Sequence, residues 1–263
     1  MERHVFNTVA EVSRLALLRN VIESGRVALG AVLNMGCPET AEIAGYAGLD
    51  FVWIDSEHGA MGIDTIKQMI VAAASSDCAP LVRVRANDAN LLKPVLDLNP
   101  AGVIIPMVMT AEDAEAAVAA CRYPLGGIRG CGVKRGAAYN SIPLNTYFDQ
   151  SDEAPWVIVQ IEHVRAVENL DKILAVKGLN SICVGPCDLA MSMGYSHDLE
   201  NEEVQKVIDE ICRKTKKAGL VLGTASGNLP RWRQRGINWF AGTGDAGLVA
   251  AGFRAFCKEN TLS

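Results

Sequence analysis

Two carboxylates stand where short apolar runs of the sequence end. Glu162 closes the run Trp156–Ile161, and Asp188 follows the run Ser181–Cys187. A carboxylate that ends a buried strand has left the core and faces whatever lies beyond the strand tip. Two such groups that converge suit a hard divalent cation, which keeps positions open for substrate and water. The placement favours a metal-assisted enzyme, although an ion pair or a helix cap would also explain acids at these positions.

Eight short apolar runs alternate with longer helical patterns along the chain. Each run is nearly continuous and often β-branched, as expected for strands that are covered on both faces. Eight such strands in 263 residues predict a (β/α)₈ barrel, with 1–263 forming a single domain. A doubly wound open sheet is the rival, but no Gly-x-Gly-x-x-Gly turn follows the first strand. The predicted strands are Val27–Leu33, Phe51–Ile54, Pro80–Val84, Gly102–Pro106, Trp156–Ile161, Asn180–Val184, Leu220–Gly223 and Ile237–Ala241.

One connection breaks this alternation. Tyr123–Pro155 separates the fourth and fifth strands and is dense in glycine between Gly126 and Gly132. Long connections in compact domains are usually functional, so we expect this one at the catalytic face. The predicted helices are Val9–Ser24, before the first strand, and then Ile63–Ser75, Ala89–Leu98, Ala111–Arg122, Val164–Ala175 and Glu202–Ala218.

The bulk composition narrows the class of partner and the compartment. A net charge of −5 and a pI near 5.5 argue against nucleic acid, which needs a concentrated basic face. No apolar run approaches the roughly 20 residues that a membrane helix requires. The 8 cysteines form no Cys-x-x-Cys pair and are spread through predicted strands and helices. That pattern favours buried thiols in a reducing cytoplasm over a disulfide framework or a zinc site.

In a barrel enzyme the chemistry gathers at the carboxyl ends of the strands. The second strand is followed by His58 and the third carries Arg83. His58 could instead be a satisfied buried histidine, and Arg83 could be neutralised by Asp55 or Glu57. No lysine stands at a predicted strand end, which disfavours a Schiff-base mechanism because that chemistry needs a fixed amine. A metal would then have to act as the electron sink.

Several motifs occur together in the order of one known family. They are Ile54–His58, Pro80–Arg83 with Asn87-Asp88, Arg122–Pro124 with Gly127–Gly130, Val159–Glu162, and Gly185-Pro186 with Asp188-Leu189. From about Gly30 to the C-terminus the chain closely resembles the HpcH/HpaI aldolases. These are metal-dependent pyruvate aldolases, which include 4-hydroxy-2-oxoheptanedioate and 2-keto-3-deoxy sugar-acid aldolases. The resemblance implies a (β/α)₈ TIM barrel of the phosphoenolpyruvate/pyruvate-binding type with an N-terminal helix.

The resemblance also implies catalytic roles. Glu162 and Asp188 would bind the divalent metal, which would be Mg²⁺, Mn²⁺ or Co²⁺. His58 would be the catalytic base, and Asp97, in the helix after the third strand, would orient it, although Asp97 could equally be a surface residue. Arg83 would hold the pyruvyl end of the substrate and stabilise the developing enolate.

Substrate contacts are implied for four further positions. Arg83 and Gln160 would contact the substrate, and Gly185, Pro186 and Cys187 would bring backbone amides at a helix N-terminus to the pyruvate carboxylate. Cys187 stands where alanine is commoner in the family, which puts the substrate in doubt more than the reaction. The family is typically a hexamer built as a trimer of dimers with exchanged C-terminal helices, so a homo-oligomer is expected.

The implied activity is reversible cleavage of a 4-hydroxy-2-oxo acid to pyruvate and an aldehyde through a metal-bound enolate. An oxaloacetate decarboxylase, or another lyase that forms the pyruvate enolate, is the alternative on the same site. A catalytically silent barrel that serves as a binding or assembly protein is the rival from another class. The combination of His58, Arg83, Glu162 and Asp188 argues against that rival.

Overall fold

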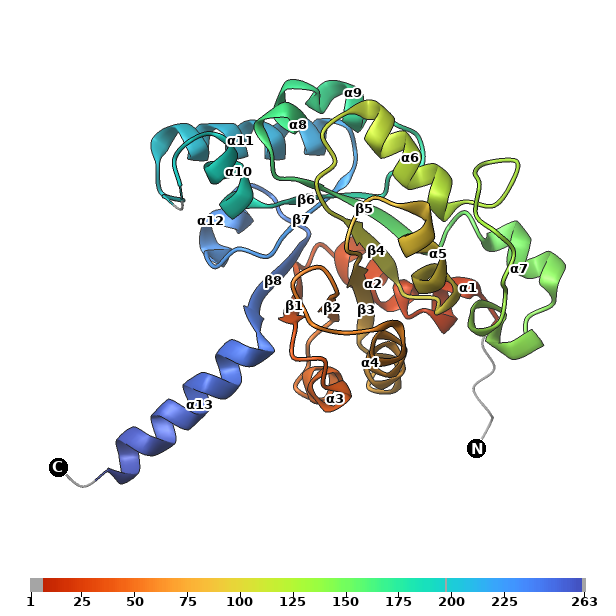
Figure 1. The fold of residues 1–263 in the computed structure, drawn as a ribbon, viewed down its shortest axis with the longest axis horizontal. Coiled ribbons are helices and arrows are strands. Elements are labelled where there is room, and N and C mark those ends of the chain that lie inside the picture. The colour runs from red at the N-terminus through yellow and green to blue at the C-terminus, as the bar shows by residue number, and fades with distance from the viewer. Residues whose placement is uncertain (1–6, 197, 262–263) are drawn as a thin grey trace.

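The computed structural model describes residues 7–196 and 198–261. Eight parallel strands close into a barrel, in which each strand pairs with its neighbours in chain order and β8 pairs back with β1. This confirms the predicted (β/α)₈ fold (Figure 1). The strands are β1 (Ala28–Leu33), β2 (Phe51–Asp55), β3 (Ala79–Arg83), β4 (Gly102–Ile105), β5 (Trp156–Ile161), β6 (Ser181–Val184), β7 (Val221–Thr224) and β8 (Trp239–Gly244).

The helices mostly follow the sequence pattern, with two differences. The predicted N-terminal helix is broken at Arg14, whose left-handed φ of 65° separates α1 from α2. Val164–Ala175 is likewise two short helices that meet at Asn169. The helices are α1 (Val9–Val12), α2 (Leu15–Glu23), α3 (Pro38–Tyr46), α4 (Ile63–Ser75), α5 (Ala89–Asp97), α6 (Ala111–Cys121), the 3₁₀ helix η1 (Arg135–Asn140), α7 (Leu144–Gln150), α8 (Val164–Glu168), α9 (Leu170–Leu174), α10 (Pro186–Ser192), α11 (Glu202–Lys217), α12 (Leu229–Gln234) and α13 (Asp245–Asn260).

Side chains along each strand alternate between the barrel interior and the helical layer, because successive residues of a strand point to opposite faces. On β2, Val52 and Ile54 join the core between strands and helices, whereas Phe51 and Trp53 fill the interior. The next inward position on β2 is Asp55, and it lies in register with Arg83 on β3. The interior is therefore apolar at the amino ends of the strands and polar at their carboxyl ends.

The long connection Tyr123–Pro155 lies at the amino ends of the strands, so the expectation that it lies at the catalytic face was wrong. Tyr147 of this connection packs in the same buried cluster as Val9, Val12 and the interior residue Trp156. Figure 1 shows α7 near α1 and on the opposite side of the barrel from α10 and α12. The reason is topological. A segment that leads from a helix to a strand must return to the amino ends, whereas only strand-to-helix segments reach the carboxyl ends.

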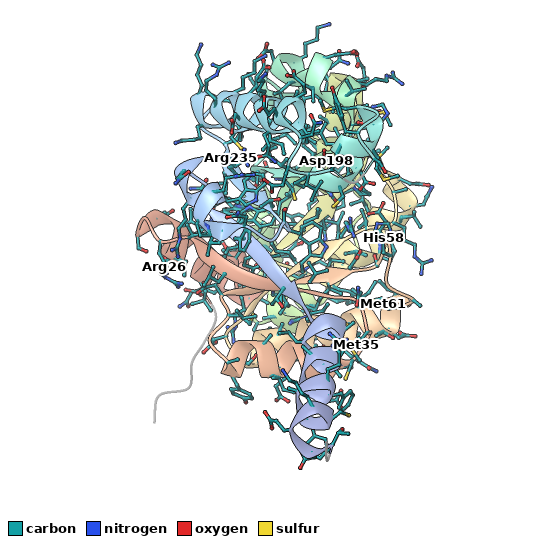
Figure 2. All side chains as sticks on the ribbon, turned by 90° about the vertical axis from the view of Figure 1, so that its left-hand side faces the viewer. Arg26, Met35, His58, Met61, Asp198 and Arg235 are labelled. Atoms are coloured by element: carbon teal, nitrogen blue, oxygen red, sulfur yellow. The ribbon has the colours of Figure 1, made fainter. Side chains whose placement is uncertain are left out.

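The C-terminal helix α13 does not pack along its own barrel. It begins at the end of β8 and extends away from the other elements (Figure 1). Its first residue, Asp245, is buried and accepts the backbone N–H groups of Asn34 and Met35 at 3.1 and 3.2 Å. Figure 2 shows Met35 beside the start of this helix. The turn after β1 therefore anchors the point from which α13 departs.

The barrel interior leaves no room beside Trp239, and this can be tested. A Cβ atom at Gly223 would lie 1.7 Å from the Cε2 atom of the buried Trp239 ring. That ring also packs edge-on against Phe51 at a centroid distance of 5.6 Å. We expect Gly223→Ala to lower the free energy of unfolding by about 1–3 kcal/mol in urea titrations, because the ring or the strand must move. Gly227→Ala, where the new Cβ meets open space, is the matched control, and equal stabilities of the two variants would contradict this packing.

Candidate active site

A cavity of about 250 Å³ opens at the carboxyl ends of the strands. It contains every site residue predicted from the sequence except Asp97. Its lining also includes five residues that the sequence analysis did not single out. The lining residues are Val32, Trp53, His58, Arg83, Gln160, Glu162, Val184, Gly185, Pro186, Cys187, Asp188, Ala225 and Ser226.

Glu162 is held from two sides at the base of this cavity. It follows the last residue of β5 and is only 3% exposed. The backbone N–H of Met107 donates to Oε1 at 2.8 Å, and the side-chain amide of Gln160 donates to Oε2 at 2.6 Å. A Cβ atom at Gly185 would lie 2.6 Å from Oε2, so only glycine lets the end of β6 come this close. These contacts fix the direction of the carboxylate.

The electrostatic surroundings of Glu162 favour a cation. Burial raises the pKa of Glu162 to about 7; the Met107 N–H and Arg83 oppose this rise, and the charges of Asp188 and Glu57 add to it. Asp188 lies in the first turn of α10 and lines the same cavity. Acids that share a cavity repel each other, and a bound cation would relieve this repulsion.

The donor set matches one type of metal. Among the described residues, no group of three or more His, Cys, Asp or Glu side chains could hold a metal ion. A structural zinc site, which usually takes four nitrogen or sulfur ligands, is therefore a poor match. Two carboxylates that border an open cavity suit Mg²⁺, Mn²⁺ or a similar ion, which retains water or binds substrate oxygens at its other positions.

Arg83 is tied to Asp55 by a two-pronged ion pair. Arg83 Nε lies 2.9 Å from Asp55 Oδ1, and Nη2 lies 2.7 Å from Oδ2. Burial alone would raise the pKa of Asp55, but the hydrogen bonds and charge of Arg83 hold it below its usual range. Arg83 Nη1 also lies 2.8 Å from Glu57 Oε2, so both ion pairs that the sequence analysis weighed as alternatives are present. Arg83 nevertheless lines the cavity, so these pairs hold it there.

His58 lies on the turn after β2, and the carboxylate of Asp55 holds the backbone of this turn. Asp55 Oδ1 accepts the backbone N–H groups of Glu57 and His58 at 3.1 and 3.3 Å. Arg85 also donates to the backbone oxygen of Met61 at 3.0 Å, near the end of the turn. The His58 side chain is 65% exposed, which excludes the alternative of a satisfied buried histidine. Figure 2 shows His58 near the edge of the molecule that Met61 also borders.

Asp97 is the predicted site residue that this chain does not bring to the cavity. It is the last residue of α5, and its carboxylate lies 3.4 Å from Nη2 of Arg129. The Arg129 guanidinium stacks over the ring of Tyr123 at 4.6 Å and donates to the backbone oxygen of Leu96 at 2.9 Å. Asp97 and Arg129 thus lie with the long connection at the amino ends of the strands. Within one chain Asp97 stands at the far end of the barrel from His58.

Five cavity residues were missed by the sequence analysis: Val32, Trp53, Val184, Ala225 and Ser226. Val32 on β1 and Trp53 on β2 both line the cavity. Strand alternation could have predicted Trp53, because it lies two positions before Asp55 and therefore points to the same face of the strand. The Arg83 guanidinium lies 5.1 Å from the Trp53 ring. Ala225 and Ser226 follow β7, which ends at Thr224, one residue later than predicted. A thiol nucleophile finds no support, because burial raises the pKa of both Cys183 and Cys187.

Comparisons with known proteins agree with this geometry. The sequence profile of the HpcH/HpaI aldolase/citrate lyase family matches residues 32–250. A hydroxypyruvate/pyruvate aldolase from Agrobacterium fabrum is 39% identical over 212 residues, which cover 80% of this chain and 79% of that protein. A 4-hydroxy-2-oxo-heptane-1,7-dioate aldolase from Salmonella dublin is 35% identical over 254 residues, covering 93% and 96%. The crystal structure of an HpcH/HpaI aldolase/citrate lyase family protein from Burkholderia cenocepacia superposes with a TM-score of 0.85 at 27% identity, covering 93% of this chain and 98% of that one.

The raised pKa of Glu162 predicts how the stability of the metal-free protein depends on pH. Between the usual value of 4.5 and about 7, the folded chain binds more protons at this position than the unfolded chain does. Stability should therefore fall as pH rises through this window, by on the order of 3 kcal/mol. Urea titrations of wild type and Glu162→Gln across the window test this, because the variant lacks the titrating group. Parallel stability profiles for the two proteins would contradict the assignment.

Proposed function

The chain belongs to the HpcH/HpaI aldolase/citrate lyase family, and we propose that it is a divalent-metal-dependent aldolase. It is a carbon–carbon lyase that reversibly cleaves a 4-hydroxy-2-oxo acid to pyruvate and an aldehyde. The convergence of Glu162, Asp188, Arg83 and His58 on one cavity carries this proposal. The similarity to aldolases from Agrobacterium fabrum and Salmonella dublin, which extends over most of this chain, supports the reaction class.

Glu162 and Asp188 are the proposed metal ligands. These two residues would hold a divalent cation, Mg²⁺, Mn²⁺ or Co²⁺, which would supply Lewis acidity toward the 2-oxo acid group of the substrate. Gln160 orients this site, because its amide donates to Glu162 while its oxygen faces Arg83 Nη1 at 3.5 Å. The second N–H of the same amide is left for the substrate contact that we propose for Gln160.

The pyruvyl carboxylate is proposed to bind at the start of α10. Gly185 allows the close approach to Glu162, and Pro186, which has no N–H, occupies the first helical position. The N–H groups of Cys187 and Asp188 follow in the first turn, where a helix offers no internal acceptor. They are the donors that we assign to the carboxylate.

Arg83 and His58 are proposed to handle the charge and the proton of the reaction. His58 takes the proton of the C4 hydroxyl, the C3–C4 bond breaks, and the aldehyde leaves. The electron pair left on C3 delocalises toward the 2-oxo oxygen. Asp55 engages Nε and Nη2 of Arg83, and Nη1 lies 2.8 Å from Glu57 and 3.5 Å from the Gln160 oxygen, so the developing charge would share Nη1 with these two groups. Such an electrostatic donor is typically worth about 10²–10³ in rate, and a histidine base about 10²–10⁴.

We further propose a homo-oligomer, specifically a hexamer built as a trimer of dimers with exchanged C-terminal helices. The helix α13 supports this, because it leaves the barrel with four large apolar side chains exposed: Leu248, Val249, Phe253 and Phe256. Exposed apolar groups in this number normally mark an interface. In such an assembly Asp97 would orient His58 from a neighbouring subunit, since in its own chain it lies at the opposite end of the barrel.

A reducing compartment, the cytoplasm, is proposed from the cysteines. Cys78, Cys121, Cys183 and Cys212 are buried as free thiols within the core. Burial raises the pKa of Cys78, Cys121 and Cys212 to about 12, so these thiols are inert packing groups.

The proposed metal ligands make the most direct activity prediction. Glu162→Ala and Asp188→Ala should abolish cleavage of a panel of 4-hydroxy-2-oxo acids, because each removes one of two anions that hold the cation. Chelator-treated wild type should lose the activity and regain it with Mg²⁺, Mn²⁺ or Co²⁺. Glu200→Ala, which removes an exposed carboxylate paired with Arg231, is the control. Full activity after rigorous metal removal would refute the proposal, and CO₂ release from oxaloacetate without aldehyde release would favour the decarboxylase alternative.

The exposed face of α13 predicts the assembly state. The double substitution Phe253→Ser and Phe256→Ser should shift the protein to smaller species in sedimentation velocity experiments, because it removes two apolar side chains that are 69% and 66% exposed in the single chain. Arg254→Ser on the same helix serves as the control and should leave the sedimentation coefficient unchanged. An unchanged coefficient for the double variant would show that α13 does not hold the oligomer together.

A further inference from the structure

Trp53 lies in the wall of the cavity, and the proposed mechanism gives it no role. It stands on β2 two positions before Asp55, so the two side chains point to the same face of the strand. Trp53 is only 2% exposed although it lines the cavity, and Val32, its partner in register on β1, lines the cavity beside it. The indole therefore forms part of the base of the cavity.

Hydrogen bonding does not explain a tryptophan at this position. A buried tryptophan usually finds an acceptor for its indole N–H, as Trp239 does by donating to Ser181 Oγ at 3.0 Å. The Nε1 atom of Trp53 is buried and has no acceptor among the residues that the structure describes. A buried donor without a partner is destabilising, and a phenylalanine or leucine would avoid that cost. The contribution of Trp53 must therefore come from its ring.

The face of this ring lies against Arg83. The guanidinium carbon of Arg83 lies over the indole, 5.1 Å from the ring centroid. A cation within about 6 Å of an aromatic face is attracted to it, and tryptophan gives the strongest attraction of this kind. The attraction increases where water is excluded, and both residues are buried. The contact thus uses a property that distinguishes tryptophan from the other apolar residues.

The edge of the Arg83 guanidinium is held by different groups. Asp55 engages Nε and Nη2, and Nη1 lies 2.8 Å from Glu57 and 3.5 Å from the Gln160 oxygen. These contacts along the edge determine how the guanidinium is turned, but they do not oppose its movement toward the barrel interior. The Trp53 ring, one inward position deeper on β2, blocks that movement.

The indole of Trp53 is itself supported from the barrel interior. Trp239 packs against it at a centroid distance of 6.1 Å, and Phe51 packs against Trp239 at 5.6 Å. Trp239 is fixed in turn by its hydrogen bond to Ser181 and by the lack of space beside Gly223. The three aromatic rings therefore form a rigid support for the guanidinium.

We propose that Trp53 is a positioning residue for Arg83, an inference that rests on the proposed aldolase function. The ring fixes the depth of the guanidinium, and with it the distance from Arg83 to the oxygen on which the enolate charge develops. A misplacement of about 1 Å in an active site can cost about 10²-fold in rate. Because this charge is larger in the transition state than in the bound substrate, the loss should appear mainly in kcat.

Steady-state kinetics of Trp53→Phe and Trp53→Leu test this role. Phenylalanine retains a ring face and leucine does not, so kcat for cleavage should fall by about tenfold or more with leucine and several-fold less with phenylalanine. KM should change little. In an Arg83→Lys background Trp53→Leu should change kcat by no more than about twofold, since a positioning residue acts through the residue it positions. Equal losses for phenylalanine and leucine, or an undiminished loss in the Arg83→Lys background, would overturn the inference.

Trp232 on α12 provides the matched control. It is also 2% exposed and has Arg235 over its ring at 5.0 Å, but it does not line the cavity. Trp232→Leu should reduce stability in urea titrations much as Trp53→Leu does, while kcat stays at the wild-type value. A loss of kcat as large as that of Trp53→Leu would show that lost packing accounts for both effects, and would overturn the inference.

A readout that is independent of turnover separates this inference from the proposed function. A proton above an aromatic face resonates at lower frequency, so the guanidinium N–H signals of Arg83 should move to higher frequency in NMR spectra of Trp53→Leu. Arg83→Lys identifies these signals, and Trp232→Leu should leave them in place. Unmoved Arg83 signals in Trp53→Leu would overturn the inference even if the enzyme is an aldolase. A wild type that cleaves no 4-hydroxy-2-oxo acid would refute the proposed function, whatever the Arg83 signals show.

Discussion

An excess of negative charge at one end of the barrel is the constraint on which the site depends. Among the described residues that line the cavity, Arg83 is the only one with a permanent positive charge, and Asp55 already neutralises it. Glu162 and Asp188 face the same space, and the pKa of Glu162 is raised to about 7 mainly by its burial, with the charges of Asp188 and Glu57 adding to the rise. Buried acids persist in folded proteins when they are paired or bind a cation. A divalent cation would balance the charges of Glu162 and Asp188, which Arg83 does not neutralise because it is paired with Asp55.

The fold creates this imbalance through strand alternation and packing. Phe51, Trp53 and Trp239 fill the amino half of the interior, so the polar inward positions are confined to the carboxyl ends. Removing either Asp55 or Arg83 would leave the other as an unpaired buried charge, which typically costs about 3–5 kcal/mol, so each residue requires the other. Because Asp55 also holds the turn after β2, the positions of Arg83, Glu57 and His58 are coupled. The proposed chemistry would therefore depend on the carboxylate of Asp55, which need not touch the substrate.

Much of this architecture could be predicted from the sequence, and the failures have physical causes. The apolar runs identified eight strands within a few residues, and Ile63–Ser75 has the predicted bounds. Asp55 emerged only as one of two alternative partners of Arg83, because pairing depends on the register of β2 against β3, which no local pattern specifies. The connection Tyr123–Pro155 was misplaced relative to the cavity, and Asp97 lies away from the cavity of its own chain, for one shared reason. Both lie where a helix returns to a strand, and that topology puts them at the amino ends.

Calorimetric titration of Mn²⁺ into the metal-free protein tests the central claim most directly. The account predicts one ion per chain, with affinity reduced strongly in both Glu162→Gln and Asp188→Asn. It also predicts proton release on binding below about pH 7, since Glu162 has a pKa of about 7 when no metal is bound. Binding of equal strength in wild type and both variants would contradict the account. So would a wild type that binds no ion in the presence of pyruvate.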